Sequence, residues 1–173
     1  MRRNLLLPVL CILAVGLAGG TAAAADKETD NILLSETVPF AEDSNAPGKV
    51  RDECNLGTKL TQFIQQYASK PGVTLTSDPI DESQGKVLLL EITTVVGPSG
   101  GAWSGAKSVT VEGKLLHDGE VVGTFTAARY SGGGAFGGYK GTCSILGRCV
   151  KAIGSDIAKW LAKPTMDARL GDA

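Results

Sequence analysis

The sequence predicts an α+β protein, with a single antiparallel or mixed sheet of about four to five strands and two helices packed on one face. Two segments carry apolar residues at helical spacing, around residues 52–67 and 142–161. Alternating or β-branched apolar runs surround the first helix and lead to the second, in the order β-α-β-β-β-β-α. A length of 173 residues, 43% of them hydrophobic and 20% charged, suits one domain.

The first 25 residues have the layout of a secretory signal peptide. Arg2 and Arg3 precede an apolar run, and small residues follow up to Ala25, where we expect cleavage. The run is about 13 to 15 residues long, shorter than the roughly 20 that cross a bilayer, so no stable membrane anchor is expected. Residues 26–163 would form the domain, in the periplasm or secreted, and residues 164–173 a disordered tail.

Cleavage would also change the charge balance. It removes Arg2 and Arg3 and no acidic residue, which leaves 15 basic against 18 acidic residues and a net charge of −3. This balance argues against electrostatic binding of nucleic acid or of anionic membranes.

Apolar side chains of one parity predict the first strand: Ile32, Leu34, Val38 and Phe40. A helix is expected to start near Asp52, with a stripe formed by Leu56, Leu60, Phe63, Ile64 and Tyr67. Pro71 and Gly72 would end it before a short strand at Val73–Thr76. The nearly continuous apolar run at residues 87–96 predicts a central strand buried on much of both faces.

A hairpin is predicted around Asp118 and Gly119. A two-residue loop would place Glu112 opposite Phe125, whereas a three-residue loop that starts at His117 keeps one face of the hairpin apolar. We therefore predict the longer loop, a type I turn with a glycine bulge at Gly119.

The final helix is predicted to begin at Thr142 or Ser144, because either residue can cap it. Its buried stripe is expected to comprise Leu146, Cys149, Val150, Ile153, Ile157, Trp160 and Leu161. Gly147 and Gly154 lie beside this stripe, where close backbone packing would offset the helix-destabilising effect of glycine.

Three cysteines remain after cleavage, and in an oxidising compartment an odd number predicts one disulfide and one free thiol. Cys149 lies on the apolar stripe and suits a buried free thiol. Cys54 lies away from the stripe of its own helix, which favours a Cys54–Cys143 disulfide between the two helix beginnings. The local pair Cys143–Cys149 stays open, because helices running in opposite directions would have distant beginnings.

Residues 132–137 fit the spacing of a dinucleotide-binding loop and lie between a strand and a helix. The neighbouring strands are predicted as antiparallel hairpins, so a flexible connection fits better, or a loop that presents Phe136, Tyr139 and Lys140 to a partner. Trp103 lies in a second glycine-rich loop, where it folds over the core or stacks on a sugar or a partner chain.

No catalytic or metal-binding set can be assembled from the sequence. His117 is the only histidine and falls at a hairpin tip, which disfavours nucleophilic catalysis and metal binding. Asp78, Asp81 and Glu82 fall in a turn that contains proline and are expected to be solvated rather than paired catalytic carboxylates. We predict no enzymatic activity, no cofactor and no metal.

The order of elements resembles a group of bacterial envelope proteins. The resemblance is carried by the hairpin at residues 109–122, the glycine-rich loop at 132–138 and the helix at 145–161. The group has the small α+β domain seen in the periplasmic part of curli-secretion channels and in outer-membrane activators of penicillin-binding proteins. The resemblance implies a binding or assembly role. Unlike lipoprotein members of the group, this chain has no small residues directly before Cys11, so no lipid anchor is expected.

We therefore expect a non-enzymatic periplasmic module that binds an envelope protein or a cell-wall component, and no nucleic acid. Partner-binding candidates are Trp103, Phe136, Tyr139 and Lys140. The alternative is a periplasmic glycan or small-ligand binder that uses Trp103, Tyr130, Phe136 and Tyr139. The oligomeric state is left open, as is pairing of another chain with an exposed strand edge near Ile32.

Overall fold

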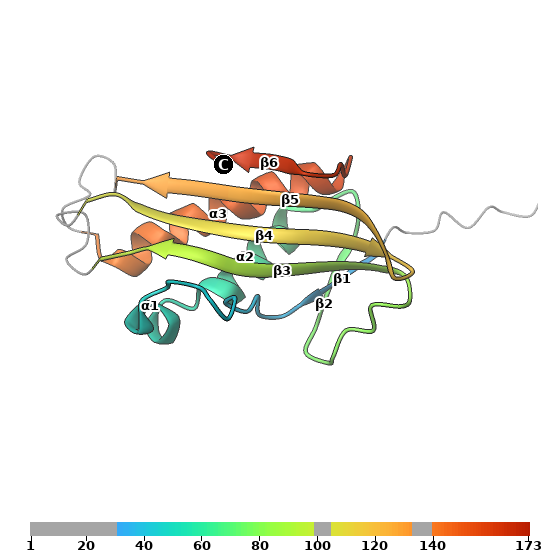
Figure 1. The fold of residues 1–173 in the computed structure, drawn as a ribbon, viewed down its shortest axis with the longest axis horizontal. Helices are drawn as coiled ribbons and strands as arrows, with labels where there is room; N and C mark the ends of the chain where they lie inside the picture. Colours follow the sequence, from blue (N-terminus) through green and yellow to red (C-terminus); the bar gives the residue numbers. More distant parts are fainter. Residues whose placement is uncertain (1–30, 99–104, 133–139) are drawn as a thin grey trace, which may run out of the picture.

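The computed structural model describes residues 31–98, 105–132 and 140–173, which form an α+β fold around one mixed sheet. The strands are β1 (Ile32–Ser35), β2 (Val73–Thr76), β3 (Lys86–Val96), β4 (Lys107–His117), β5 (Glu120–Ser131) and β6 (Ala168–Gly171). The helices are α1 (Gly48–Glu53), α2 (Leu56–Tyr67) and α3 (Thr142–Leu161). The predicted fold class is confirmed, with six strands in the order β2-β1-β3-β4-β5-β6 rather than four to five (Figure 1).

The first strand lies inside the sheet. β1 pairs in parallel with both β2 and β3, so the exposed edge expected near Ile32 is not there. The edge strands of the described sheet are β2 and β6.

The helix predicted from Asp52 onward is divided in two. α1 ends at Glu53 and α2 begins at Leu56, and between them Asn55 has a φ of 50°, in the left-handed region. A helix cannot continue through that conformation, so the chain changes direction there.

The helices α2 and α3 pack together on one face of the sheet and run in the same direction. β1 is parallel to β3, and β4 is antiparallel to both β3 and β5, so β1, β3 and β5 point the same way. α2 returns along the sheet after β1, and α3 returns after β5. The beginnings of the two helices therefore lie at the same end of the molecule.

The core lies between these helices and the sheet face that they cover. The predicted stripe of α3 is buried throughout, and Trp160 packs edge-to-face on Phe125 with ring centroids 4.7 Å apart. A Cβ added at Gly154 would lie 2.7 Å from the Cβ of Phe63, so the predicted close packing is confirmed there. At Gly147 an added Cβ would meet nothing within 4 Å, so the close packing predicted at this second glycine is wrong.

The start of α3 is held by a tertiary contact. The helix begins at Thr142, as predicted, but its N-cap residue is Gly141 and no side chain caps it. The Thr142 hydroxyl instead donates to the carbonyl oxygen of Pro98 at 3.2 Å, which ties the helix to the end of β3.

The hairpin between β4 and β5 has a two-residue loop, so the predicted three-residue loop is wrong. His117 pairs with Glu120, and Asp118 and Gly119 have φ values of 52° and 83°. Two successive positive φ values are typical of a type I′ turn, whose twist matches that of the strands.

A bulge at Val122 then shifts the pairing of the hairpin. Beyond it Val111 lies opposite Ala127, and Gly113 lies opposite Phe125. The predicted three-residue loop, His117 to Gly119, would instead place Val111 opposite Phe125, a difference of two residues. A shift by an even number of residues leaves the side chains beyond the bulge on their predicted face, so one face is apolar there as expected. Before the bulge, Val121 pairs with Leu116 and is exposed.

The C-terminal segment adds the sixth strand where the sequence predicts a disordered tail. β6 pairs in parallel with residues 125–128 of β5. The guanidinium of Arg129 lies 2.7 Å from the carboxylate of Asp156 on α3 and 3.1 Å from that of Asp172. The hydrogen bond to Asp156 is the main cause that raises the pKa of Arg129. These contacts join strand, helix and C-terminal segment.

Candidate functional site

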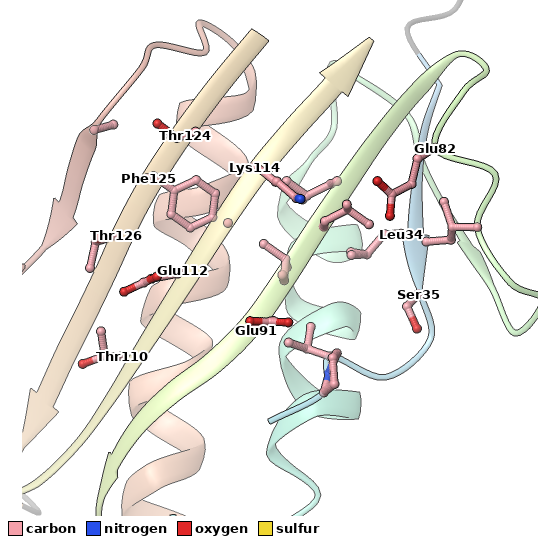
Figure 2. A pocket seen from close by; sticks show the side chains of 18 of the residues that line it. Leu34, Ser35, Glu82, Glu91, Thr110, Glu112, Lys114, Thr124, Phe125 and Thr126 are labelled. Carbon is pink, nitrogen blue, oxygen red and sulfur yellow. The ribbon is translucent and has the colours of Figure 1, made fainter. Parts of the chain in front are cut away.

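The face of the sheet opposite α2 and α3 carries a broad groove of about 1340 Å³, which no described helix lines. Its floor is formed by β3, β4 and β5, and its borders by residues 77–82 and by the segment that contains β6 (Figure 2). Along β3 the exposed Glu91 alternates with Leu90 and Ile92, which are buried on the helix side. We call this surface the open face.

The registers of β3, β4 and β5 arrange the side chains of the open face in four rows. They are the lysine row (Leu89, Lys114, Thr124), the glutamate row (Glu91, Glu112, Thr126), the threonine row (Thr94, Thr110, Ala128) and the tyrosine row (Val96, Ser108, Tyr130). Successive rows are two residues apart along β4, or about 6.7 Å, so the four rows extend over about 20 Å.

The glutamate row places two carboxylates directly opposite each other. Glu91 pairs with Glu112 in the register of β3 and β4, and both side chains are exposed. Within the described residues, neither carboxylate has a hydrogen bond or an ion pair. Like charges that face each other across two strands destabilise a sheet, so folding does not explain this pair.

The groove as a whole is acidic. Among its described lining residues five are acidic and two are basic: Asp78, Glu82, Glu91, Glu112, Asp167, Lys114 and Arg169. In that part of the chain no ion pair within 4.0 Å joins Lys114 or Arg169 to a carboxylate. Lys114 and Arg169 are therefore available to a bound molecule, whereas Asp167 accepts a hydrogen bond from the Thr124 hydroxyl.

The tyrosine row is the apolar end of the open face. Tyr130 is 68% exposed and Val96 is 46% exposed. Both are exposed to solvent at one end of the sheet, where an aromatic ring can cover an apolar group of a ligand.

The border formed by residues 77–85 is anchored to the hairpin. The amide of Asp118 donates to the carbonyl of Gly85 at 2.9 Å, and the amide of Gly85 donates to the Asp118 carboxylate at 2.7 Å. Asp81 accepts hydrogen bonds from the hydroxyl and the amide of Ser83, which lower the pKa of Asp81. Asp78 and Glu82 line the groove, whereas Asp81 stabilises the turn.

The other candidates from the sequence lie elsewhere. Trp103, Phe136 and Tyr139 lie outside the described residues. Lys140 is half-buried just before α3 and does not line the groove. His117 lies at the end of β4 with Nε2 3.6 Å from the Asp118 carboxylate, and the described residues contain no group of three metal-ligating side chains.

The disulfide Cys54–Cys143 is confirmed, with a Cα–Cα distance of 4.9 Å. It joins the end of α1 to the first turn of α3, beside a hollow of about 340 Å³. Cys149 is the buried free thiol, and its Sγ lies 3.7 Å from the carbonyl oxygen of Lys107. Burial raises the pKa of Cys149 to about 11, so near neutral pH it is a poor nucleophile for disulfide exchange.

The glutamate pair was missed because residues 87–96 read as one apolar run. The prediction that this strand is buried on much of both faces is wrong at Glu91, which is exposed, and at Leu89, which is half-buried. The available signal was the single charged residue inside that run. Its partner Glu112 could be identified only with the correct pairing of β3 and β4.

None of the helices within the described ranges is both long and apolar enough to span a membrane. Neither a protein-family model nor a curated protein sequence matches the chain. Among solved structures, it is similar to the PelC dodecamer from Paraburkholderia phytofirmans, with 14% identity over 73% of this chain and 86% of that chain, at a TM-score of 0.44.

Two other similar structures come from different bacteria. One is a Xanthomonas campestris protein of the family DUF330, with 18% identity, 76% of this chain and 83% of that chain covered, and a TM-score of 0.42. The other is a minor lipoprotein from Acinetobacter baumannii, with 16% identity over 78% of this chain and 93% of that chain, and a TM-score of 0.36. These similarities do not show the expected resemblance to curli-secretion channels or to activators of penicillin-binding proteins. At these identities and TM-scores they assign neither a family nor a function.

Proposed function

We propose that this chain is an exported, non-enzymatic module of the bacterial envelope that binds a partner protein on its open face. The observation that carries the proposal is the contrast within one sheet, where one face is buried under α2 and α3 and the other holds a groove of about 1340 Å³. The groove presents charged side chains such as Glu91, Glu112 and Lys114, for which the described fold shows no structural partner, and the exposed Tyr130 lies on the same face beyond the groove.

Export is supported by two features. Residues 1–25 have the layout of a signal peptide, although they lie outside the described residues. The Cys54–Cys143 disulfide joins segments 89 residues apart, and such bonds persist in oxidising compartments. A periplasmic location is consistent with both.

A binding role is supported over an enzymatic one by the chemistry of the groove. His117 does not line it, so its described lining offers no imidazole as a base. In glycosidase-type carboxylate pairs one acid sits in an apolar pocket that keeps it protonated, whereas Glu91 and Glu112 are both exposed. Such a surface is suited to recognition.

The test is site-specific photo-crosslinking in the envelope of intact cells. A photoreactive amino acid at Thr110, in the centre of the open face, is compared with one at Gln66, an exposed position on α2. We expect discrete crosslinked protein bands from position 110, and we expect these bands to be absent from position 66. The same bands from both positions, or none from position 110, would contradict the proposal.

A second candidate function is glycan or small-ligand binding, which the exposure of Tyr130 favours because aromatic rings stack on sugar faces. Binding of soluble peptidoglycan fragments to the purified protein, lost on Tyr130→Ala, would support this candidate. If wild type shows no binding at millimolar fragment concentration, the candidate fails.

A further inference from the structure

We infer that the occupant of the open face is an extended polypeptide segment with a Lys or Arg over the glutamate row and an apolar side chain four residues away over the tyrosine row. The inference rests on the proposed function and names the chemistry of the partner. It is carried by the charge of the groove and by the spacing of the rows.

Charge complementarity identifies the basic residue. Glu91 and Glu112 lie directly opposite each other, exposed and without hydrogen bonds or ion pairs in the described part of the chain. A single ammonium or guanidinium group placed between the two carboxylates would neutralise their repulsion and contact both. The excess of acidic over basic side chains along the groove favours the same sign of ligand charge.

Spacing matches an extended chain and, for such a chain, gives the position of the apolar residue. The glutamate and tyrosine rows are two rows apart, with the threonine row between them, which corresponds to about 13 Å. In an extended peptide, residues i and i+4 point to the same side and are also separated by about 13 Å. A basic residue over Glu112 therefore places the side chain four residues away over Tyr130 and Val96.

The lysine row limits the ligand residue that lies on the other side of the glutamate row from the tyrosine row. Lys114 lies two residues from Glu112 along β4, with its side chain exposed. A second basic side chain there would be repelled, so the ligand has an acidic or polar residue at the position next to this row. The small and polar threonine row imposes little selection on the residue between the two anchors.

The experiment measures fluorescence anisotropy of labelled synthetic peptides with the oxidised mature protein. One peptide carries Arg and Phe at positions i and i+4, and a second, of identical composition, carries them at i and i+3, on opposite sides of an extended chain. We expect the first peptide to bind more tightly and its affinity to fall as NaCl is raised, because exposed ion pairs are screened by salt.

Three variants locate the binding. Glu91→Gln and Glu112→Gln should each weaken binding of the first peptide roughly two- to fivefold. Glu120→Gln, an exposed glutamate of β5 that does not line the groove, should leave it unchanged and controls for net charge. Thermal unfolding of each variant verifies that the fold is retained.

Equal affinity for the two peptides, or no effect of the groove variants, would overturn the inference. If crosslinks from position 110 to envelope proteins persist while the peptides fail, the inference is wrong and the proposed function stands. If neither the crosslinks nor peptide binding is observed, and peptidoglycan fragments bind less tightly to Glu112→Gln, the occupant is a glycan. The inference and the proposed function are then both wrong.

Discussion

The two faces of the sheet differ although they are formed by the same strands. On the helix side Ile92, Val109 and Val111 are fully buried beneath α2 and α3. On the open face their neighbours Glu91, Thr110 and Glu112 line a groove and are partly or fully exposed. The comparison teaches that the main apolar core lies on one face, whereas on the other only one end, at Val87 and Leu116, is buried and the middle is free to carry recognition.

The disulfide should have the largest effect, because it closes a long loop on the helix-covered side. Replacing both cysteines, Cys54→Ser with Cys143→Ser, should lower the free energy of unfolding by about 4 kcal/mol, within the usual range of about 2–5. Urea unfolding with and without dithiothreitol measures it. The reductant should destabilise wild type and leave the double variant unchanged; equal sensitivity of both would show that the bond contributes nothing.

Adjacent positions on β3 compare the two faces directly. Ile92→Ala removes a side chain with 0% exposure and should lower the free energy of unfolding by about 2–5 kcal/mol. Glu91→Ala, one residue away on the open face, should cause no such loss, because it removes an exposed side chain and the repulsion with Glu112, and should change it by at most about 1 kcal/mol. Chemical denaturation of both variants measures this difference, and similar losses at the two positions would remove the distinction between the faces.

Two glycines of α3 sharpen the comparison on the helix side. Gly154→Ala should destabilise by about 1–3 kcal/mol, because the new methyl group would overlap Phe63. Gly147→Ala, with open space around it, should stabilise by up to about 1 kcal/mol through helix propensity. Thermal unfolding should therefore shift in opposite directions, and a gain at both positions would refute the close packing of α2 on α3.

The smallest effect is expected on the open face, with the opposite sign. Glu112→Gln removes the repulsion across the glutamate row and should stabilise the protein by about 0.2–1 kcal/mol. The control Glu120→Gln should show no such gain. A gain that disappears at high salt would confirm an electrostatic origin, whereas a loss of stability would mean that the carboxylate has a structural role.

Some features were correctly predicted because they depend on local pattern. The apolar stripe of α3 follows from helical periodicity, and the whole stripe is buried. The positions of the cysteines relative to the helix stripes favoured the Cys54–Cys143 disulfide that forms, and the common direction of α2 and α3 decided it over the local Cys143–Cys149 pair. The apolar face of the β4–β5 hairpin was also right, since even an error of two residues in register preserves the faces.

Features that depend on pairing between distant segments were not predictable. β6 is a four-residue strand whose stability comes from its bonds to β5 and from Arg129, neither of which leaves a periodic pattern. The position of β1 between β2 and β3 depends on parallel pairing, which local alternation does not specify. The glutamate pair depends on the register of β3 against β4.

The sequence by itself determined the fold class and the face that each helix buries, because hydrophobic periodicity acts within single elements. Tertiary structure alone decided the strand order, the common direction of α2 and α3, and the meeting of Glu91 with Glu112 on an uncovered face. Those features arise from pairings between residues far apart in the chain, where many registers and directions satisfy the same local pattern and only their combined packing selects one.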